Sequence, residues 1–276
     1  MAIWGFGIVQ SLELERTGQR ALGELCEKLA AIADVRLRPF VAQSHAELAR
    51  AVDDEEVALA WLPPIPTIEL EDSRLATVLA IPLRNGQTSY SSALVTRRGI
   101  RPNASRDLAT TLAELRGRRV AWVDAESAAG YLVPRMQLAA SGVEDPGSFW
   151  GRETFVRTHP AVIDAVVSGQ AEVGATYCQL DAQKNVVRGA WIDEEGLARR
   201  PIEVLATFGP IPNDALVVSN LVPVADRSAL TRAMQVPRVR ELLGQLVGAT
   251  DFRMPSATHY EPLRHLLRTA RARGSR

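Results

Sequence analysis

The sequence predicts an α/β protein in which buried strands alternate with amphipathic helices. Apolar runs of strand length, rich in β-branched residues, recur along the chain, and segments with helical spacing separate them. The alternation breaks near residue 97, where Gly99 and Pro102 follow a strand, and a second strand–helix series then begins. These observations indicate a chain with two similar halves, each built around a largely parallel sheet.

In the first half, each predicted element has a local signal. Strands are expected at 3–9, 35–40, 56–61, 76–82 and 89–97, and helices at 12–32 and 44–52. Ser44 is a good N-cap, and Glu47 completes a capping box at the start of the second helix. Pro63, Pro64 and Pro66 end the third strand. This order of elements is typical of βαβ units.

The second half repeats the pattern and then adds a helical tail. Helices are expected at 105–117, 132–140 and 161–167, and strands at 120–123, 154–156, 172–176, 202–208 and 215–219. Gly169 is expected just past the end of the third of these helices. From Asp226 the pattern is helical, with breaks at Pro237 and Pro255.

Composition excludes several classes of protein. The 276 residues are 46% hydrophobic and 23% charged, with a formal net charge of zero, so no overall field attracts nucleic acid or a membrane surface. No apolar segment approaches the ~20 residues that a membrane-spanning helix needs. The N-terminus lacks the features of a signal peptide, which favours the cytoplasm, or the periplasm if a signal has been removed. Cys26 and Cys178 have neither metal nor disulfide spacing. We expect no metal, no cofactor and no insertion into a membrane.

A turn of small residues is the strongest local candidate for a site. Ser127, Ala128, Ala129 and Gly130 lie between the buried strand at 120–123 and the next helix. A strand, a tight turn and a helix start aim free backbone N–H groups at one point, and the helix dipole adds positive potential there. The sequence therefore predicts an anion site. The alternative is an ordinary connection between a strand and a helix.

Several dispersed stretches carry a resemblance to a known family. They are ALAWLPP at 58–64, YSSALV at 90–95, LRGRRVA at 115–121, SAAGYLVP at 127–134, His159, VGA at 173–175 and GPIPND at 209–214. In this order they resemble the phosphate, phosphite and phosphonate substrate-binding proteins of ABC transporters, the PhnD-like group with the type II periplasmic binding protein fold. The resemblance covers most of residues 50–220.

The resemblance implies a two-lobed fold with two hinge crossings and a central cleft. Lobe I would comprise residues 1–96 and 209–276, and lobe II residues 97–208. Hinge closure would capture a small oxyanion such as phosphonate, phosphite or phosphate, without catalysis. An ABC permease would be the partner if the protein is exported.

The resemblance also implies particular ligand-binding residues. These are the Ser127 hydroxyl, the N–H groups of Ala128, Ala129, Gly130 and Tyr131, and the side chains of Tyr90 and His159. Two further candidates are Tyr177, to line the cleft, and Ser11, to supply the N-terminal donors of the second lobe. Each has an ordinary alternative: a strand aromatic for Tyr90, a capping or core residue for His159, and a plain helix start for Ser11. The chain also departs from the family, since Ala128 removes a hydroxyl donor and Glu126 adds a negative charge.

Two other functions fit the same fold. One is a cytoplasmic ligand sensor, or a biosynthetic enzyme acting on a small organic acid, which the altered turn and the N-terminus favour. The other is a domain that has lost its ligand and serves only in protein contacts. The sequence has no GxSxG, HExxH or Walker motif to support an enzyme.

Overall fold

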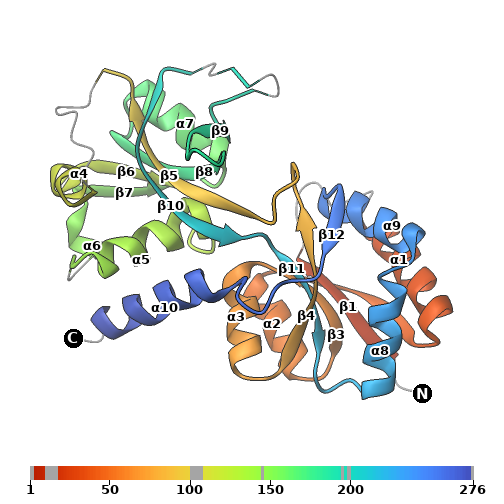
Figure 1. Ribbon diagram of the computed structural model, residues 1–276. Helices are drawn as coiled ribbons and strands as arrows, with labels where there is room; N and C mark the ends of the chain where they lie inside the picture. Colours follow the sequence, from red (N-terminus) through yellow and green to blue (C-terminus); the bar gives the residue numbers. More distant parts are fainter. Residues whose placement is uncertain are drawn as a thin grey trace. The chain divides into compact units, whose positions relative to one another are not determined.

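The computed structural model describes residues 3–9, 18–99, 108–143, 146–193, 196–197 and 200–274. The chain divides into two compact units, each with its own sheet (Figure 1). Unit 1 comprises residues 1–88 and 212–260, and unit 2 comprises residues 89–211 and 261–276.

The chain therefore passes between the units at three positions, after Thr88, Ile211 and Tyr260. The third crossing adds to the two that the sequence predicted, because the last helix, α10 (Glu261–Gly274), packs against α5 (Val133–Ala140) of unit 2. The lobe ranges expected from the sequence stay a prediction.

The sheet of unit 1 mixes parallel and antiparallel strands. Its order is β12 (Asp251–Arg253), β4 (Ala76–Leu83), β11 (Ala215–Ser219), β3 (Val57–Leu62), β1 (Ile3–Val9) and β2 (Arg36–Ala42). β1 pairs in parallel with β2 and β3. β11 lies antiparallel between β3 and β4, so the central strands β1, β3 and β4 all run in one direction.

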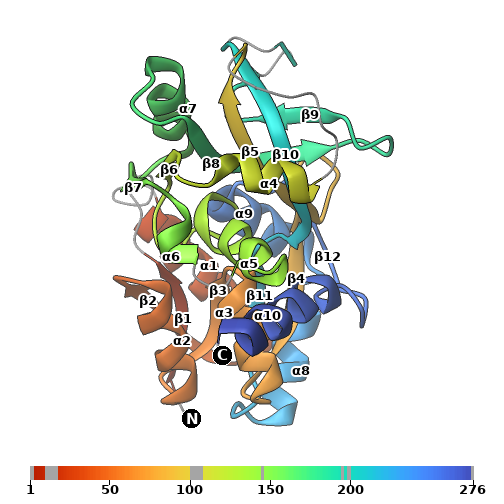
Figure 2. The same ribbon diagram turned by 90° about the vertical axis from the view of Figure 1, so that its left-hand side faces the viewer.

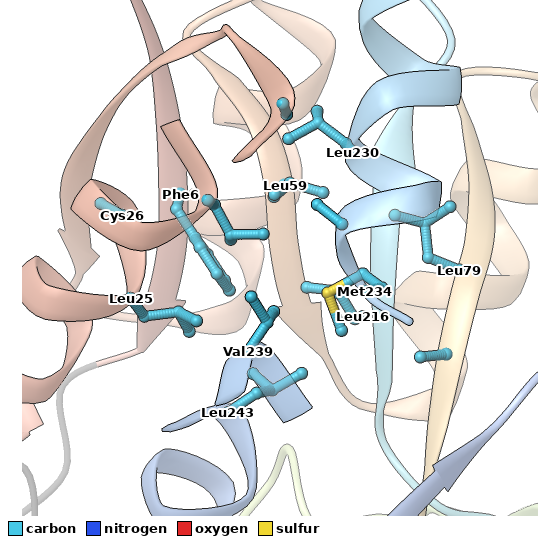
Figure 3. Close-up of a cluster of buried hydrophobic side chains, with 14 of the residues drawn as sticks. Phe6, Leu25, Cys26, Leu59, Leu79, Leu216, Leu230, Met234, Val239 and Leu243 are labelled. Atoms are coloured by element: carbon cyan, nitrogen blue, oxygen red, sulfur yellow. The ribbon is translucent and has the colours of Figure 1, made fainter. Parts of the chain in front are cut away.

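Successive side chains of β1 lie on opposite faces of the sheet and pack against different helices. Phe6 and Ile8 point into a core shared with α1 (Gly18–Ala33), α8 (Val224–Ala233) and α9 (Pro237–Val247) (Figure 3). Gly7 faces the other way, where a Cβ would lie 2.2 Å from Leu48 Cδ1. Glycine at this position thus lets the helix that carries Leu48 pack directly on the strand.

That helix is α2 (His45–Asp53), and it begins at the predicted cap. The Ser44 Oγ accepts the Glu47 N–H at 3.1 Å. The Glu47 carboxylate accepts the Gln43 N–H at 2.8 Å. In an ordinary capping box it would accept the N–H of the cap residue Ser44, so here the second bond of the box is made one residue earlier.

Replacing Ser44 with alanine is expected to lower the free energy of unfolding by ~1 kcal/mol, because the N–H of Glu47 loses its acceptor. Urea unfolding of the variant and the wild type measures this loss. A variant as stable as the wild type would contradict it. Since Ser44 belongs to unit 1 and caps an unrelated helix, the same variant serves as a control below.

The prolines after β3 open a helix that the sequence did not predict, α3 (Pro64–Asp72). Proline is tolerated in the first turn, where N–H groups have no acceptor within the helix. The Thr67 hydroxyl donates to the Pro63 carbonyl at 2.9 Å and holds the turn. The prediction that the strand ends here was right, but the prolines start a helix as well as stopping a strand.

Unit 2 contains the second sheet. Its order is β10 (Ile202–Pro212), β5 (Ser89–Arg97), β8 (Val173–Leu180), β6 (Arg119–Trp122) and β7 (Arg152–Phe155), and β9 (Val186–Gly189) pairs with β8. β6 is parallel to β7 and β8, whereas β5 is antiparallel to β8. The predicted boundaries of β1 and β5 are confirmed to the residue.

Helices cover both faces of this sheet. The helix α7 (His159–Ser168) packs on one face, where Val162 and Val166 close over Gly174 of β8. On the other face, the short π-helix η1 (Ala128–Leu132) contacts β5 and β8 and continues into α5. Figure 2 shows α10 beside α5. The remaining helices of the unit are α4 (Leu108–Leu115) and α6 (Pro146–Phe149).

Candidate functional site

A tight turn connects β6 to η1. Beyond the strand, the Asp124 carboxylate accepts the Glu126 N–H at 2.8 Å, and the Asp124 carbonyl accepts the Ser127 N–H at 3.3 Å. These two bonds reverse the chain within a few residues. The turn therefore lies at 124–127, earlier than predicted, and the small residues Ala128, Ala129 and Gly130 already belong to the helix that follows it.

Ser127 is the N-cap of η1. Its Oγ accepts the Gly130 N–H at 3.1 Å, and its carbonyl accepts the Leu132 N–H at 2.9 Å. The acceptor lies five residues back, so this turn is wider than an α-helical turn. Such π-turns are frequent at functional sites. The N–H groups of Ala128 and Ala129 belong to the first turn, where the helix itself supplies no acceptor.

Two hydrogen bonds hold η1 on the sheet. The buried Ser92 hydroxyl of β5 donates to the Ala129 carbonyl at 2.7 Å, and the Val123 N–H donates to the Gly130 carbonyl at 3.3 Å. At Gly130 a Cβ would lie 2.4 Å from Val123 Cγ2 and 2.7 Å from Ser127 Oγ. Only glycine fits between the sheet and the cap, and this fixes where the N-terminal N–H groups lie.

His159 is the first residue of α7, and Thr158 caps that helix. The imidazole Nδ1 lies 3.0 Å from the Thr176 Oγ1 of β8, and the ring contacts Tyr177 edge to face, with centroids 5.0 Å apart. Burial lowers the pKa of His159 to about 4, although the Asp124 carboxylate opposes this shift. The ring is therefore neutral at pH 7 and offers an N–H donor without a positive charge.

Tyr131 points into an aromatic cluster. Its ring lies 5.5 Å from that of Trp122 and 5.1 Å from that of Phe155, centroid to centroid. The Trp122 indole N–H donates to Glu153 at 2.6 Å, and Glu153 also pairs with Arg135 at 2.9 Å. These contacts fix the aromatic residues beside η1.

The structure brings most of the predicted residues to one end of the unit 2 sheet. Ser127, Ala128, Ala129, Gly130 and Tyr131 form the cap and η1, and His159 and Tyr177 lie at the neighbouring strand ends. Tyr90 of β5 is half-buried on the same face of its strand as Ser92. Ser11 lies outside the described residues. The binding role of these residues stays a prediction.

Three residues that shape this end of the sheet were not predicted from the sequence. They are Ser92, which holds η1, Thr176, which holds His159, and Phe155, which packs on Tyr131. Ser92 and Tyr177 are paired across β5 and β8, although 85 positions separate them in the sequence. No local sequence pattern predicts such a pairing. The alternation of Tyr90 and Ser92 on one strand face is the nearest hint that the sequence offers.

The two cysteine thiols are buried and unreactive at neutral pH. Cys26 and Cys178 are buried, and burial raises the pKa of each to about 12. Thiolate chemistry at neutral pH is thus disfavoured. Among the residues that the structure describes, no cluster of His, Cys, Asp and Glu side chains is suited to hold a metal ion.

Solved structures share this two-unit α/β fold. XAC2383 from Xanthomonas citri, bound to ATP, matches over 100% of this chain and 99% of its own, with a TM-score of 0.74 and 18% identity. PhnD1 from Prochlorococcus marinus, in complex with methylphosphonate, matches over 98% of each chain, with a TM-score of 0.66 and 15% identity. A binding protein component of an ABC phosphonate transporter from Pseudomonas aeruginosa matches over 98% of this chain and 87% of its own, with a TM-score of 0.65 and 18% identity. The expected fold class, that of the type II periplasmic binding proteins, is confirmed.

A family model matches most of the chain and identifies its family. Residues 8–260 match the family described as "ABC transporter, phosphonate, periplasmic substrate-binding protein". The chain belongs to this family, whose members bind substrates and are not enzymes. No curated protein matches the chain by sequence. In the described part of the chain, no helix is long and apolar enough to cross a membrane.

Proposed function

We propose that this protein binds a small phosphonate at the N-terminus of η1 and delivers it to an ABC permease in the periplasm. Membership of the phosphonate-binding family supports this proposal. So does the binding of methylphosphonate by PhnD1, which has the same fold. Closure of two lobes around the ligand stays a prediction.

The observation that carries the proposal is the capped start of η1. The Ser127 Oγ already accepts the Gly130 N–H, so its hydroxyl hydrogen is left to donate to a ligand. The N–H groups of Ala128 and Ala129 lie beside it, and both residues are buried. Three donors at one helix start, with the helix dipole behind them, match the oxygens of a phosphonate.

The positive potential that would attract an anion to the turn comes from backbone N–H groups and not from a cationic side chain. His159 is neutral at pH 7 because burial lowers its pKa to about 4, so it contributes a hydrogen bond and no cationic charge. Glu126 is exposed, and water and salt screen the repulsion between its carboxylate and an anion. The departure at Ala128 removes one side-chain donor and leaves its backbone N–H in place.

Replacing Ser127 with alanine is expected to weaken methylphosphonate binding by about tenfold to a hundredfold. The variant loses a donor to a charged group, which is worth about 1.5–3 kcal/mol. Isothermal titration of protein that has been unfolded, freed of bound ligand and refolded measures the dissociation constant.

The matched control is Ser44→Ala, which removes an N-cap bond of the same length in unit 1. Its affinity for methylphosphonate should equal that of the wild type. If wild-type protein binds none of methylphosphonate, phosphite and phosphate, the proposed function is wrong. If Ser127→Ala binds as tightly as the control, the site is wrong.

A further inference from the structure

Two exposed aromatic rings flank the candidate anion site. Phe155 is 46% exposed and Tyr177 is 36% exposed, and among the described residues no other aromatic side chain is as accessible. They belong to β7 and β8, the two strands on either side of β6. The turn that leads to Ser127 follows β6, the strand between them.

Both rings lie on the sheet face that η1 covers. Phe155 is paired with Trp122 on the neighbouring strand, and both rings contact Tyr131 of η1. Tyr177 is paired with Ser92, whose hydroxyl bonds the Ala129 carbonyl of η1. Paired residues in a sheet share a face, so one ring lies on each side of the start of η1.

The rings are held in place before any ligand arrives. Tyr131 packs on Phe155, with the ring centroids 5.1 Å apart. His159 packs edge to face on Tyr177 at an interplanar angle of 88°, and its Nδ1 is bonded to the buried Thr176. A side chain fixed on one side and exposed on the other loses little conformational freedom when a ligand covers it.

The charges nearby favour an apolar partner for these rings. His159 is neutral, so the ring that contacts Tyr177 carries no positive charge. Near Tyr131, the Arg135 guanidinium is paired with Glu153 and so is already neutralised. Exposed apolar rings contribute little to folding, and beside an anion site they mark a place for the organic part of a ligand.

We infer that the site prefers phosphonates that carry a planar aryl group, with Phe155 and Tyr177 covering that group while the start of η1 holds the phosphonate. This inference rests on the proposed function, because it assigns the organic half of the same ligand. Phe155 and Tyr177 are then specificity-determining residues, and small inorganic oxyanions are poorer ligands.

The test compares three ligands with one head group: methylphosphonate, cyclohexylphosphonate and phenylphosphonate. Titration calorimetry on ligand-free protein should give phenylphosphonate an affinity about tenfold or more above that of methylphosphonate, as expected for stacking on aromatic side chains. Cyclohexylphosphonate, which is as large but not planar, should fall between them.

Two variants locate the effect. Phe155→Leu and Tyr177→Leu keep an apolar side chain and remove the ring, and together they should reduce the preference for phenyl over methyl to less than about threefold. The affinity for phenylphosphonate should fall by more than that for methylphosphonate. Val187→Ala, which removes an exposed apolar side chain of β9 in the same unit, is the control and should keep the wild-type preference.

The outcomes separate the two proposals. Equal affinity of the wild type for phenylphosphonate and methylphosphonate overturns the aryl preference and leaves the proposed function standing. A preference that survives in the double leucine variant, or a variant that loses methylphosphonate equally, also overturns it. If none of the three phosphonates binds, the proposed function fails, and the inference fails with it.

Discussion

Replacing Gly130 with alanine is expected to abolish phosphonate binding and to destabilise unit 2. The new methyl group would lie 2.4 Å from Val123 Cγ2 and 2.7 Å from Ser127 Oγ, distances that real contacts do not reach. Relief requires η1 to move off the sheet, which breaks the bond from Ser127 Oγ to the Gly130 N–H and moves the donors of Ala128 and Ala129. We expect a loss of affinity above a hundredfold and about 2–3 kcal/mol of stability.

The matched control is Gly23→Ala in the middle of α1. At Gly23 a Cβ meets no heavy atom within 4 Å, and alanine is the better helix former. This variant should gain ~1 kcal/mol of stability and bind methylphosphonate as the wild type does. Urea unfolding and titration calorimetry measure both quantities. If Gly130→Ala retains wild-type affinity, the start of η1 is not the binding site.

The second large effect is a pH dependence of stability that comes from His159. Burial lowers the pKa of this residue from 6.5 to about 4. Between these values the unfolded chain binds a proton that the folded protein does not, so the free energy of unfolding falls as the pH drops from about 7 to about 4. Allowing for partial exposure of the ring, we expect a loss of roughly 2 kcal/mol from this residue.

His159→Gln isolates this contribution, because glutamine does not titrate and retains an amide that can bond Thr176. Chemical unfolding at pH 7 and pH 4.5 gives the loss of stability for each protein. The wild type should lose more than the glutamine variant, and the difference between the two losses is the effect of His159. His265→Gln, at an exposed position of α10, controls for the removal of a histidine as such. Parallel pH profiles for the wild type and His159→Gln would contradict the assignment.

Much of the fold was predictable from local patterns. β1 and β5 begin and end at the residues predicted from the sequence, and Ser44 caps α2 as predicted. The helix α3 was not predicted, because its prolines are typical of residues that end a strand. The placement of β11 between β3 and β4, and the packing of α10 on α5, depend on contacts between distant parts of the chain. A local pattern does not encode such contacts.

The candidate site shows the same division. The run of small residues from Ser127 to Gly130 predicted a turn with free N–H groups, and the structure shows why glycine is required at its end. The π-turn was not predicted, and the bond that holds it on the sheet comes from Ser92, on a strand distant in the sequence. Phe155 was overlooked because a single phenylalanine in a short strand normally indicates core, whereas here it is exposed on an edge strand.

Binding at the start of η1 is tested most directly by an NMR titration of 15N-labelled, ligand-free protein with methylphosphonate. We expect the amide protons of Ala128 and Ala129 to move strongly downfield on binding, because these N–H groups gain an anionic acceptor. The Gly130 amide, already bonded to Ser127 Oγ, should move less. Saturable binding that leaves the Ala128 and Ala129 amides unchanged would contradict binding at the start of η1 and place the ligand elsewhere.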